Sequence, residues 1–179
     1  MATTSSIVGT VSSAIFNDFL IEDGTIARIR DGQAPICSNF SSLSIPAGAT
    51  IDGIEVLLEG RALDANHDTA VGDWIYVSND GGSSWSTARS ITTGSWLLYG
   101  GGTNALEEAG GASELWGESW NATTAAAIQV KMAWSTNDGD AVFLDYVKVR
   151  ITYTEAAVAI PKSLTINGVA IINGKLTIK

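Results

Sequence analysis

The sequence predicts an all-β fold, an antiparallel β-sandwich of the jelly-roll type that is followed by a short β repeat at the C-terminus. Two observations carry this prediction. Polar and apolar residues alternate with a period of two in several segments, and clusters of Gly, Asn and Asp separate these segments. Helical periodicity is nearly absent. About eight to ten strands fit before residue 155, which is typical of a sandwich.

Three segments show the alternation most clearly, and each carries charged residues on the face opposite the apolar one. Strands of this half-polar kind belong to antiparallel sheets with one solvated face. The expected core-facing residues are Ile54, Val56 and Leu58 in 51–61; Ala126, Ile128, Val130, Met132 and Trp134 in 126–134; and Phe143, Val147, Val149, Ile151 and Tyr153 in 143–153.

The chain divides into four parts on the basis of these patterns. Residues 1–20 have no firm period and are expected to form an N-terminal arm or a first strand, and residues 21–154 the sandwich. Residues 155–162 read as a linker, because Pro161 disfavours a helix there. Residues 163–179 form a β repeat for oligomerisation or anchoring.

The C-terminal repeat is a six-residue unit that runs twice and starts a third time, with Asn-Gly closing each full unit. Two geometries fit it: a coiled stem, or a three-stranded meander with two-residue Asn-Gly turns. Neither can bury its apolar residues alone, so we expect stacking or association with copies of the chain. The expected interface residues are Leu164, Ile166, Val169, Ile171, Ile172, Leu176 and Ile178.

Composition excludes several classes of partner and site. The chain has 179 residues, with 10 basic and 19 acidic side chains and a formal charge of -9. Without a basic cluster, no nucleic-acid partner is expected. We expect no membrane span, no secretory signal and therefore synthesis in a cytoplasm. Cys37 is the only cysteine, which rules out an intrachain disulfide and suggests a small core residue.

One motif indicates a structural turn. Residues 78–85 match the pattern Ser-x-Asp-x-Gly-x-x-Trp, the Asp box that sialidases repeat once per propeller blade. We expect Ser78, Asp80, Gly82 and Trp85 to build a hairpin turn, in which the carboxylate accepts main-chain N–H groups and the glycine supplies a positive φ. A single copy favours a structural role over catalysis.

No residue pattern indicates an enzyme, a cofactor or a metal site. His67 is the only histidine, which leaves a transition-metal site or a catalytic triad without support. Asp145 lies on an apolar face, and three interpretations are open: it caps main-chain N–H groups of a neighbouring loop, lies at the exposed end of the strand, or binds Ca²⁺.

An acidic cluster in 107–118 lies beside two tryptophans. The preferred interpretation of this cluster is that Leu115, Trp116 and Trp120 anchor a loop to the sandwich. The second is that the aromatic residues bind sugar, and the third is that two of the carboxylates hydrolyse a glycan. The candidate sugar-binding residues are Trp96, Tyr99, Trp116 and Trp120.

Four segments together resemble a family of jelly-roll β-sandwich proteins of phage particles: 44–56, 78–85, 114–120 and 143–149. The C-terminal repeat resembles the Leu-Thr-Ile-Asn-Gly units of trimeric phage fibre stems. The resemblance implies a homotrimeric capsid decoration or cement subunit in the virion, with the major capsid protein or another virion protein as its partner. The alternative that it implies is a tail-fibre or receptor-binding module for host carbohydrate.

Overall fold

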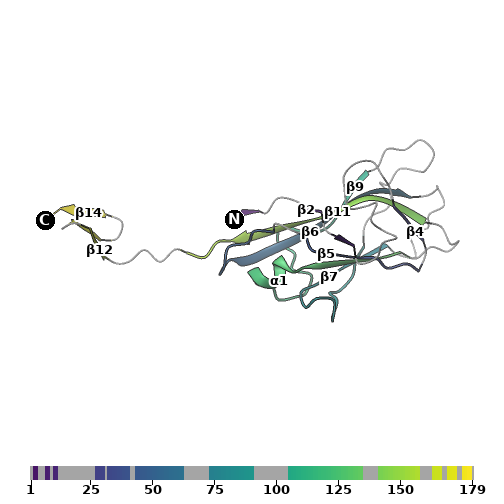
Figure 1. Ribbon diagram of the computed structural model, residues 1–179, viewed down its shortest axis with the longest axis horizontal. Coiled ribbons are helices and arrows are strands. Elements are labelled where there is room, and N and C mark those ends of the chain that lie inside the picture. Colours follow the sequence, from purple (N-terminus) through teal and green to yellow (C-terminus); the bar gives the residue numbers. More distant parts are fainter. Residues whose placement is uncertain are drawn as a thin grey trace.

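The described strands pair antiparallel in two sheets that face each other as a sandwich, and in a third, three-stranded sheet at the C-terminus (Figure 1). The computed structural model describes residues 2–3, 7–8, 10–11, 27–30, 32–40, 43–62, 73–90, 105–134, 141–157, 163–166, 169–172 and 175–178. The prediction of an all-β sandwich is confirmed. Within these ranges there is one short helix, α1 (Ala122–Ala126).

The first sheet is built around the two longest strands, β6 (Thr50–Ala62) and β11 (Ala141–Thr154), which pair with each other. Strand β9 (Ala105–Gly111) pairs with the other side of β6. The far side of β11 carries three short strands in succession: β4 (Ala27–Arg30), β2 (Ile7–Val8) and β1 (Ala2–Thr3).

The second sheet has the order β3-β5-β10-β7-β8. Its longest members, β7 (Asp73–Ser78) and β10 (Gln129–Trp134), pair along six residues each. The other members are β3 (Thr10–Val11), β5 (Ile36–Ser38) and β8 (Arg89–Ser90). The described N-terminal strands therefore join both sheets, β1 and β2 the first and β3 the second.

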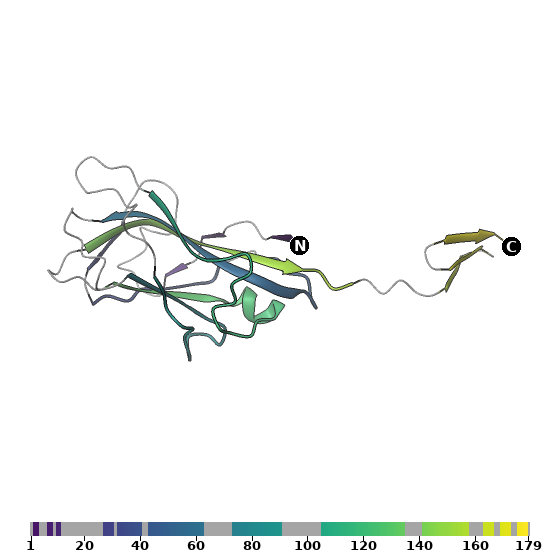
Figure 2. The same cartoon turned by 180° about the vertical axis from the view of Figure 1, so that it is seen from behind.

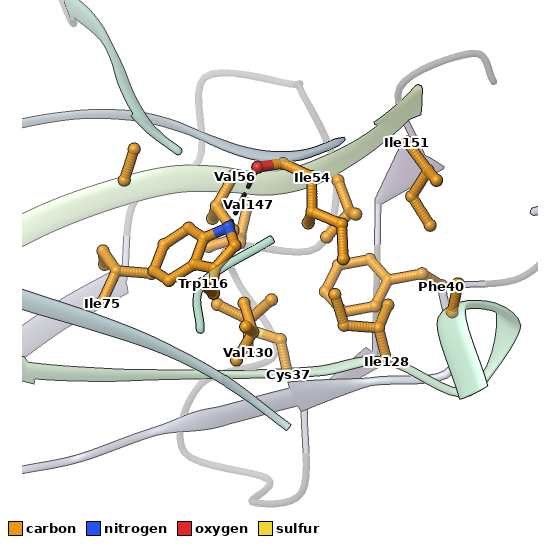
Figure 3. Packing of buried hydrophobic residues seen from close by; sticks show 14 of the residues in the cluster. Cys37, Phe40, Ile54, Val56, Ile75, Trp116, Ile128, Val130, Val147 and Ile151 are labelled. Atoms are coloured by element: carbon orange, nitrogen blue, oxygen red, sulfur yellow. Dashed lines mark hydrogen bonds between the residues drawn. The ribbon is translucent and has the colours of Figure 1, made fainter. Parts of the chain in front are cut away.

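Figure 2 shows the two sheets from behind, and Figure 3 shows side chains of the core that lies between them. Alternate residues of β6 and of 128–132, which leads into β10, supply it as predicted, because a period of two sends every second side chain inward. Ile54, Val56, Leu58, Ile128, Val130 and Met132 are all at most 1% exposed. Cys37 is buried among them, and burial raises the pKa of its thiol, so it is a small core residue as expected.

A β-bulge changes the predicted face of one residue in β11. The pairing with β6 shifts register between Leu144 and Tyr146, so Asp145 is an extra residue in the strand. An extra residue reverses the alternation, and Leu144 rather than Phe143 belongs to the core cluster with Val147. The placement of Phe143 in the core face was therefore wrong; it is only partly buried.

The segment 126–134 begins as a helix rather than as a strand. Helix α1 holds Ala126, and β10 starts only at Gln129. The side chain of Asn121 caps this helix by accepting the main-chain N–H groups of Thr123 and Thr124, at 2.9 and 3.0 Å. The Thr124 hydroxyl in return accepts the Asn121 main-chain N–H at 3.0 Å, which completes a capping box, and the helix removes Ala126 from the strand face.

Candidate functional site

The C-terminal sheet is a meander within one chain. Strands β12 (Ser163–Ile166), β13 (Val169–Ile172) and β14 (Lys175–Ile178) pair in that order. Ile166 pairs with Val169, and Ile172 with Lys175, so each connection has two residues, both of them Asn-Gly. Of the two geometries that the sequence allowed, the pairing is that of the meander. No described strand of the sandwich pairs with these three.

The register divides this sheet into an apolar and a more polar face. Directly paired residues of adjacent strands share a face, and so do residues two apart in one strand. One row of partners is Leu164, Ile171 and Leu176, and the next is Ile166, Val169 and Ile178. All six residues of this face are aliphatic, and we call it the aliphatic face. The opposite face holds Ser163, Thr165, Ala170, Ile172, Lys175 and Thr177.

The middle unit of the repeat explains how both faces arise. Units one and three carry their apolar residues at the second and fourth positions, as in Ser163–Ile166. The middle unit, Val169–Ile172, carries them at the first and third positions as well. An antiparallel partner with a two-residue turn needs this inverted phase, because equivalent positions of successive units fall on opposite faces of the sheet.

Six of the seven predicted interface residues therefore lie on the aliphatic face. Ile172 does not: it pairs with Ser163 and Lys175 on the other face. The prediction grouped Ile172 with Ile166 and Ile178 because they share a repeat column, and that grouping was wrong for an antiparallel sheet.

The hairpin of residues 78–85 forms the predicted turn. The Ser78 hydroxyl accepts the main-chain N–H of Gly82 at 2.8 Å and donates to Asp80 Oδ1 at 2.8 Å. Asp80 Oδ1 also accepts the Ser84 N–H at 2.9 Å. Gly82 has φ +88°, and a Cβ there would meet the side chains of Gln129 and Trp85. All four predicted residues thus take part in the turn or pack on it.

These hydrogen bonds hold the Asp80 carboxylate in its charged form. The Ser84 hydroxyl and main-chain N–H and the Ser78 hydroxyl together lower the pKa of Asp80 to about 2. The side chain is saturated by its own turn, which supports a structural role for the motif.

The loop that follows β9 is anchored by Trp116. Trp116 is fully buried, and its indole N–H donates to the Ile54 carbonyl at 2.9 Å (Figure 3). The Glu114 carboxylate accepts the Trp116 main-chain N–H at 2.7 Å and pairs with Arg89 at 2.8 Å. The hydrogen bond from Arg89, followed by that from the Trp116 N–H, lowers the pKa of Glu114. Leu115 and Trp120 pack against the core, so the reading of a loop anchor is confirmed.

The predicted sugar-binding group is not brought together by the described structure. Trp116 offers no stacking surface, because its ring is 0% exposed and fills the core. Trp120 is half-buried, and its indole N–H donates to the Leu115 carbonyl at 3.0 Å. Trp96 and Tyr99 lie outside the described residues, as does His67.

The outer face of the second sheet carries aromatic residues outside the predicted sugar-binding set; the sequence suggested that two of them, Trp74 and Tyr76, are exposed and cover surface between neighbouring subunits. Tyr76 and Trp74 on β7 pair with Lys131 and Ala133 on β10. The Lys131 ammonium lies 4.4 Å from the ring centres of both Tyr76 and Trp85. The alternation of both strands places these residues outward, but only the register of β7 against β10 brings them together.

The described residues contain no group of three or more His, Cys, Asp or Glu side chains that could hold a metal ion. Asp145 is buried at the bulge of β11. The described part of the chain also contains no helix that is both long and apolar enough to cross a membrane. Neither a protein-family model nor a curated protein nor a solved structure matches the chain.

Proposed function

We propose that the chain is a non-enzymatic structural protein of a phage particle, a homotrimeric capsid decoration or cement subunit that acts by interface burial. The observation that carries the proposal is the aliphatic face of β12–β14. Three strands of four residues are marginally stable in isolation, and leaving an entirely aliphatic face in water would make them less so. Association with equivalent faces of other copies removes both problems at once.

The energetics agree with a role in assembly. Fully burying one Val, Leu or Ile side chain stabilises by about 1.5–3 kcal/mol, so six residues per copy give a gross term of roughly 9–18 kcal/mol. Lost translational and rotational freedom costs about 4–15 kcal/mol. The two terms are of similar size, which suits a contact that is modest for free subunits and strong when several copies are held on one particle.

The strand order supports the jelly-roll class, to which the phage proteins that the sequence resembles belong. When β4 to β11 are numbered as eight consecutive strands, the first, eighth, third and sixth form one sheet. The second, seventh, fourth and fifth form the other. This interleaving resembles the strand order of a jelly roll and therefore favours that class.

The experiment that tests the association compares two adjacent residues on opposite faces of β13. Ile171 lies on the aliphatic face between Leu164 and Leu176, whereas Ala170 lies on the other face between Thr165 and Thr177. We expect Ile171→Glu to sediment as a monomer and Ala170→Glu to remain a trimer. A wild-type chain that is monomeric in the same measurement, or an Ile171→Glu chain that remains trimeric, contradicts the proposed association.

The place in the particle is tested separately by immunogold labelling of intact phage. Gold on the capsid shell supports the decoration role. Gold confined to the tail, or none on intact particles, contradicts that role.

A further inference from the structure

The outer face of the second sheet carries an aromatic and cationic surface that the proposed function leaves unused. Register separates it from the core: Val77 and Val130 pair on the inner face, both fully buried. The next pair, Tyr76 with Lys131, therefore lies on the outer face, as does Trp74 with Ala133. Trp74 is 37% exposed, and among the described residues only it and Leu106 are large exposed apolar side chains.

Lys131 is held between two aromatic rings. Its ammonium nitrogen lies 4.4 Å from the ring centre of Tyr76, its partner on β7, and 4.4 Å from that of Trp85. Trp85 comes from the end of the 78–85 hairpin, whose turn is fixed by the hydrogen bonds of Ser78 and Asp80. A rigid turn and a sheet register therefore fix the position of this cation in advance.

The charge of Lys131 is not neutralised by a described carboxylate. Among the described residues, ion pairs join Arg89 to Glu114 and Arg150 to Glu55, and Lys131 takes part in neither. Partial burial lowers the pKa of Lys131, which is the effect expected of an ammonium that has lost water without gaining a carboxylate. A positive centre flanked by aromatic rings thus stands on a chain whose net charge is -9.

We propose that Trp74, Tyr76, Trp85 and Lys131 form a binding surface for an acidic polysaccharide. The apolar C–H face of a sugar ring stacks on the exposed indole of Trp74, whose π-face carries partial negative charge. A carboxylate or sulfate of the same or the next sugar pairs with Lys131. A neutral glycan makes no use of the cation, so charge complementarity selects an acidic one.

Two other classes of macromolecule fit this surface less well. Nucleic acid carries one phosphate per nucleotide, and its binding relies on several basic residues that release counterions. One lysine does not supply them, whereas a saccharide that stacks on the exposed indole of Trp74 needs only one charged contact. A stable protein partner needs about 800 Å² on each side. Trp74 is the one large exposed apolar residue described on this face, since Leu106 belongs to β9 of the other sheet.

The test titrates the full chain with a panel of acidic oligosaccharides, comprising alginate, polygalacturonate, hyaluronan and chondroitin sulfate, and follows binding by calorimetry. Uncharged cello- and malto-oligosaccharides of matched length and a single-stranded DNA oligonucleotide serve as comparisons. We expect saturable binding of at least one acidic saccharide, weaker binding of the neutral ones, and a shallow dependence on salt because one cation is involved.

Variants separate the roles of the Trp74 indole and the Lys131 ammonium. Trp74→Ala is expected to lower the affinity for the acidic saccharide about tenfold. Lys131→Met is expected to lower this affinity by about twofold to fivefold and to abolish the preference over neutral saccharides. Leu106→Ala, on the other sheet, is the matched control and leaves the affinity unchanged. Circular dichroism spectra that match wild type confirm that each variant is folded.

Three results overturn the proposal: no binding to any acidic saccharide of the panel, equal affinity of wild type and Trp74→Ala, or tighter binding of the oligonucleotide than of every saccharide. The proposal is independent of the C-terminal sheet. Ile171→Glu is therefore expected to leave the affinity per chain unchanged, and failure of the assembly proposal would not affect it.

Discussion

The indole N–H of Trp116 donates a 2.9 Å hydrogen bond to the main-chain carbonyl of Ile54, which lies 62 positions earlier in the chain. The Ile54 N–H in turn donates to the Glu114 carbonyl at 2.9 Å. One residue of β6 therefore anchors the loop that follows β9 through both of its main-chain groups. Trp116 adopts φ +61° to make this contact, a conformation that costs a non-glycine residue energy.

Trp116→Phe is expected to destabilise the fold by about 2–4 kcal/mol, because it leaves the buried Ile54 carbonyl without its donor and opens a cavity. Urea denaturation followed by far-UV circular dichroism measures the change. Trp74→Phe is the control: Trp74 is partly exposed, and its replacement should change the free energy of unfolding by no more than about 0.5 kcal/mol. Equal effects of the two substitutions would contradict the anchoring role.

Gly110→Ala is expected to destabilise by about 3 kcal/mol or more, because a methyl group there meets the Ile54 carbonyl and the Trp116 ring, and φ is +88°. The next residue is a matched control. A Cβ at Gly111 meets nothing within 4 Å, so Gly111→Ala should change stability by at most about 1 kcal/mol. Thermal unfolding of both variants decides the matter, and a Gly110→Ala protein as stable as Gly111→Ala would refute the close packing of the loop.

Asp80→Asn is expected to lower the melting temperature at neutral pH, because the amide cannot replace the charged acceptor of the hairpin turn. The native pKa of Asp80 is depressed to about 2. A depressed pKa means that the charged form stabilises the fold above the unfolded pKa and that this contribution is lost as the pH falls toward 2. The difference in melting temperature between wild type and variant should therefore be constant above about pH 5 and shrink below about pH 4. A difference that does not depend on pH would mean that the carboxylate charge is not involved.

Removal of residues 163–179 is expected to abolish the trimer without altering the unfolding of the sandwich. The reason is that no described strand of the sandwich pairs with β12, β13 or β14. Light scattering reports the association state and calorimetry the melting temperature. A truncated chain that remains trimeric would place the interface on the sandwich instead.

Cys37 is expected to resist modification in the native state. Burial raises the pKa of its thiol, which keeps it protonated, and its side chain is 1% exposed. A chromogenic disulfide reagent at pH 8 should react with Cys37 in urea but only very slowly without it. Rapid reaction of the folded protein would show that this part of the core opens easily.

Periodicity in the sequence was enough to predict the sandwich and much of its core. The core residues that it misplaced were misplaced because a local feature, a bulge or a helix, reverses or interrupts the alternation of the strand. The extra residue Asp145 reverses the alternation before Val147 and so moves Phe143 to the other face. The capping box at Asn121 turns the expected start of a strand at Ala126 into a helix. A bulge or a single helical turn has almost no compositional signature in one sequence.

The candidate sites were harder to predict, because they depend on which strands become neighbours. Trp116 belonged both to the first-ranked loop anchor and to the candidate sugar-binding set, and only the packing of its loop on β6, which buries the ring, decides between them. Conversely, Lys131 lies 55 positions after Tyr76 by the sequence numbering, and only the pairing of β7 with β10 brings its ammonium to that ring. The aliphatic character of the C-terminal sheet could be predicted, whereas the face of Ile172 could not, because it depended on the choice between stem and meander.

The inverted phase of Val169–Ile172 means that the true period of the C-terminal segment is a pair of units rather than one. A meander of this kind lengthens correctly only when units of the two phases alternate. A fourth unit copied from Lys175–Ile178 would place its leucine and isoleucine on the face of Lys175, so that the aliphatic face would not continue. A fourth unit copied from Val169–Ile172 would continue the aliphatic face. Tandem duplication of one hexad places two units of the same phase side by side and therefore cannot extend this sheet, whereas duplication of two adjacent hexads can.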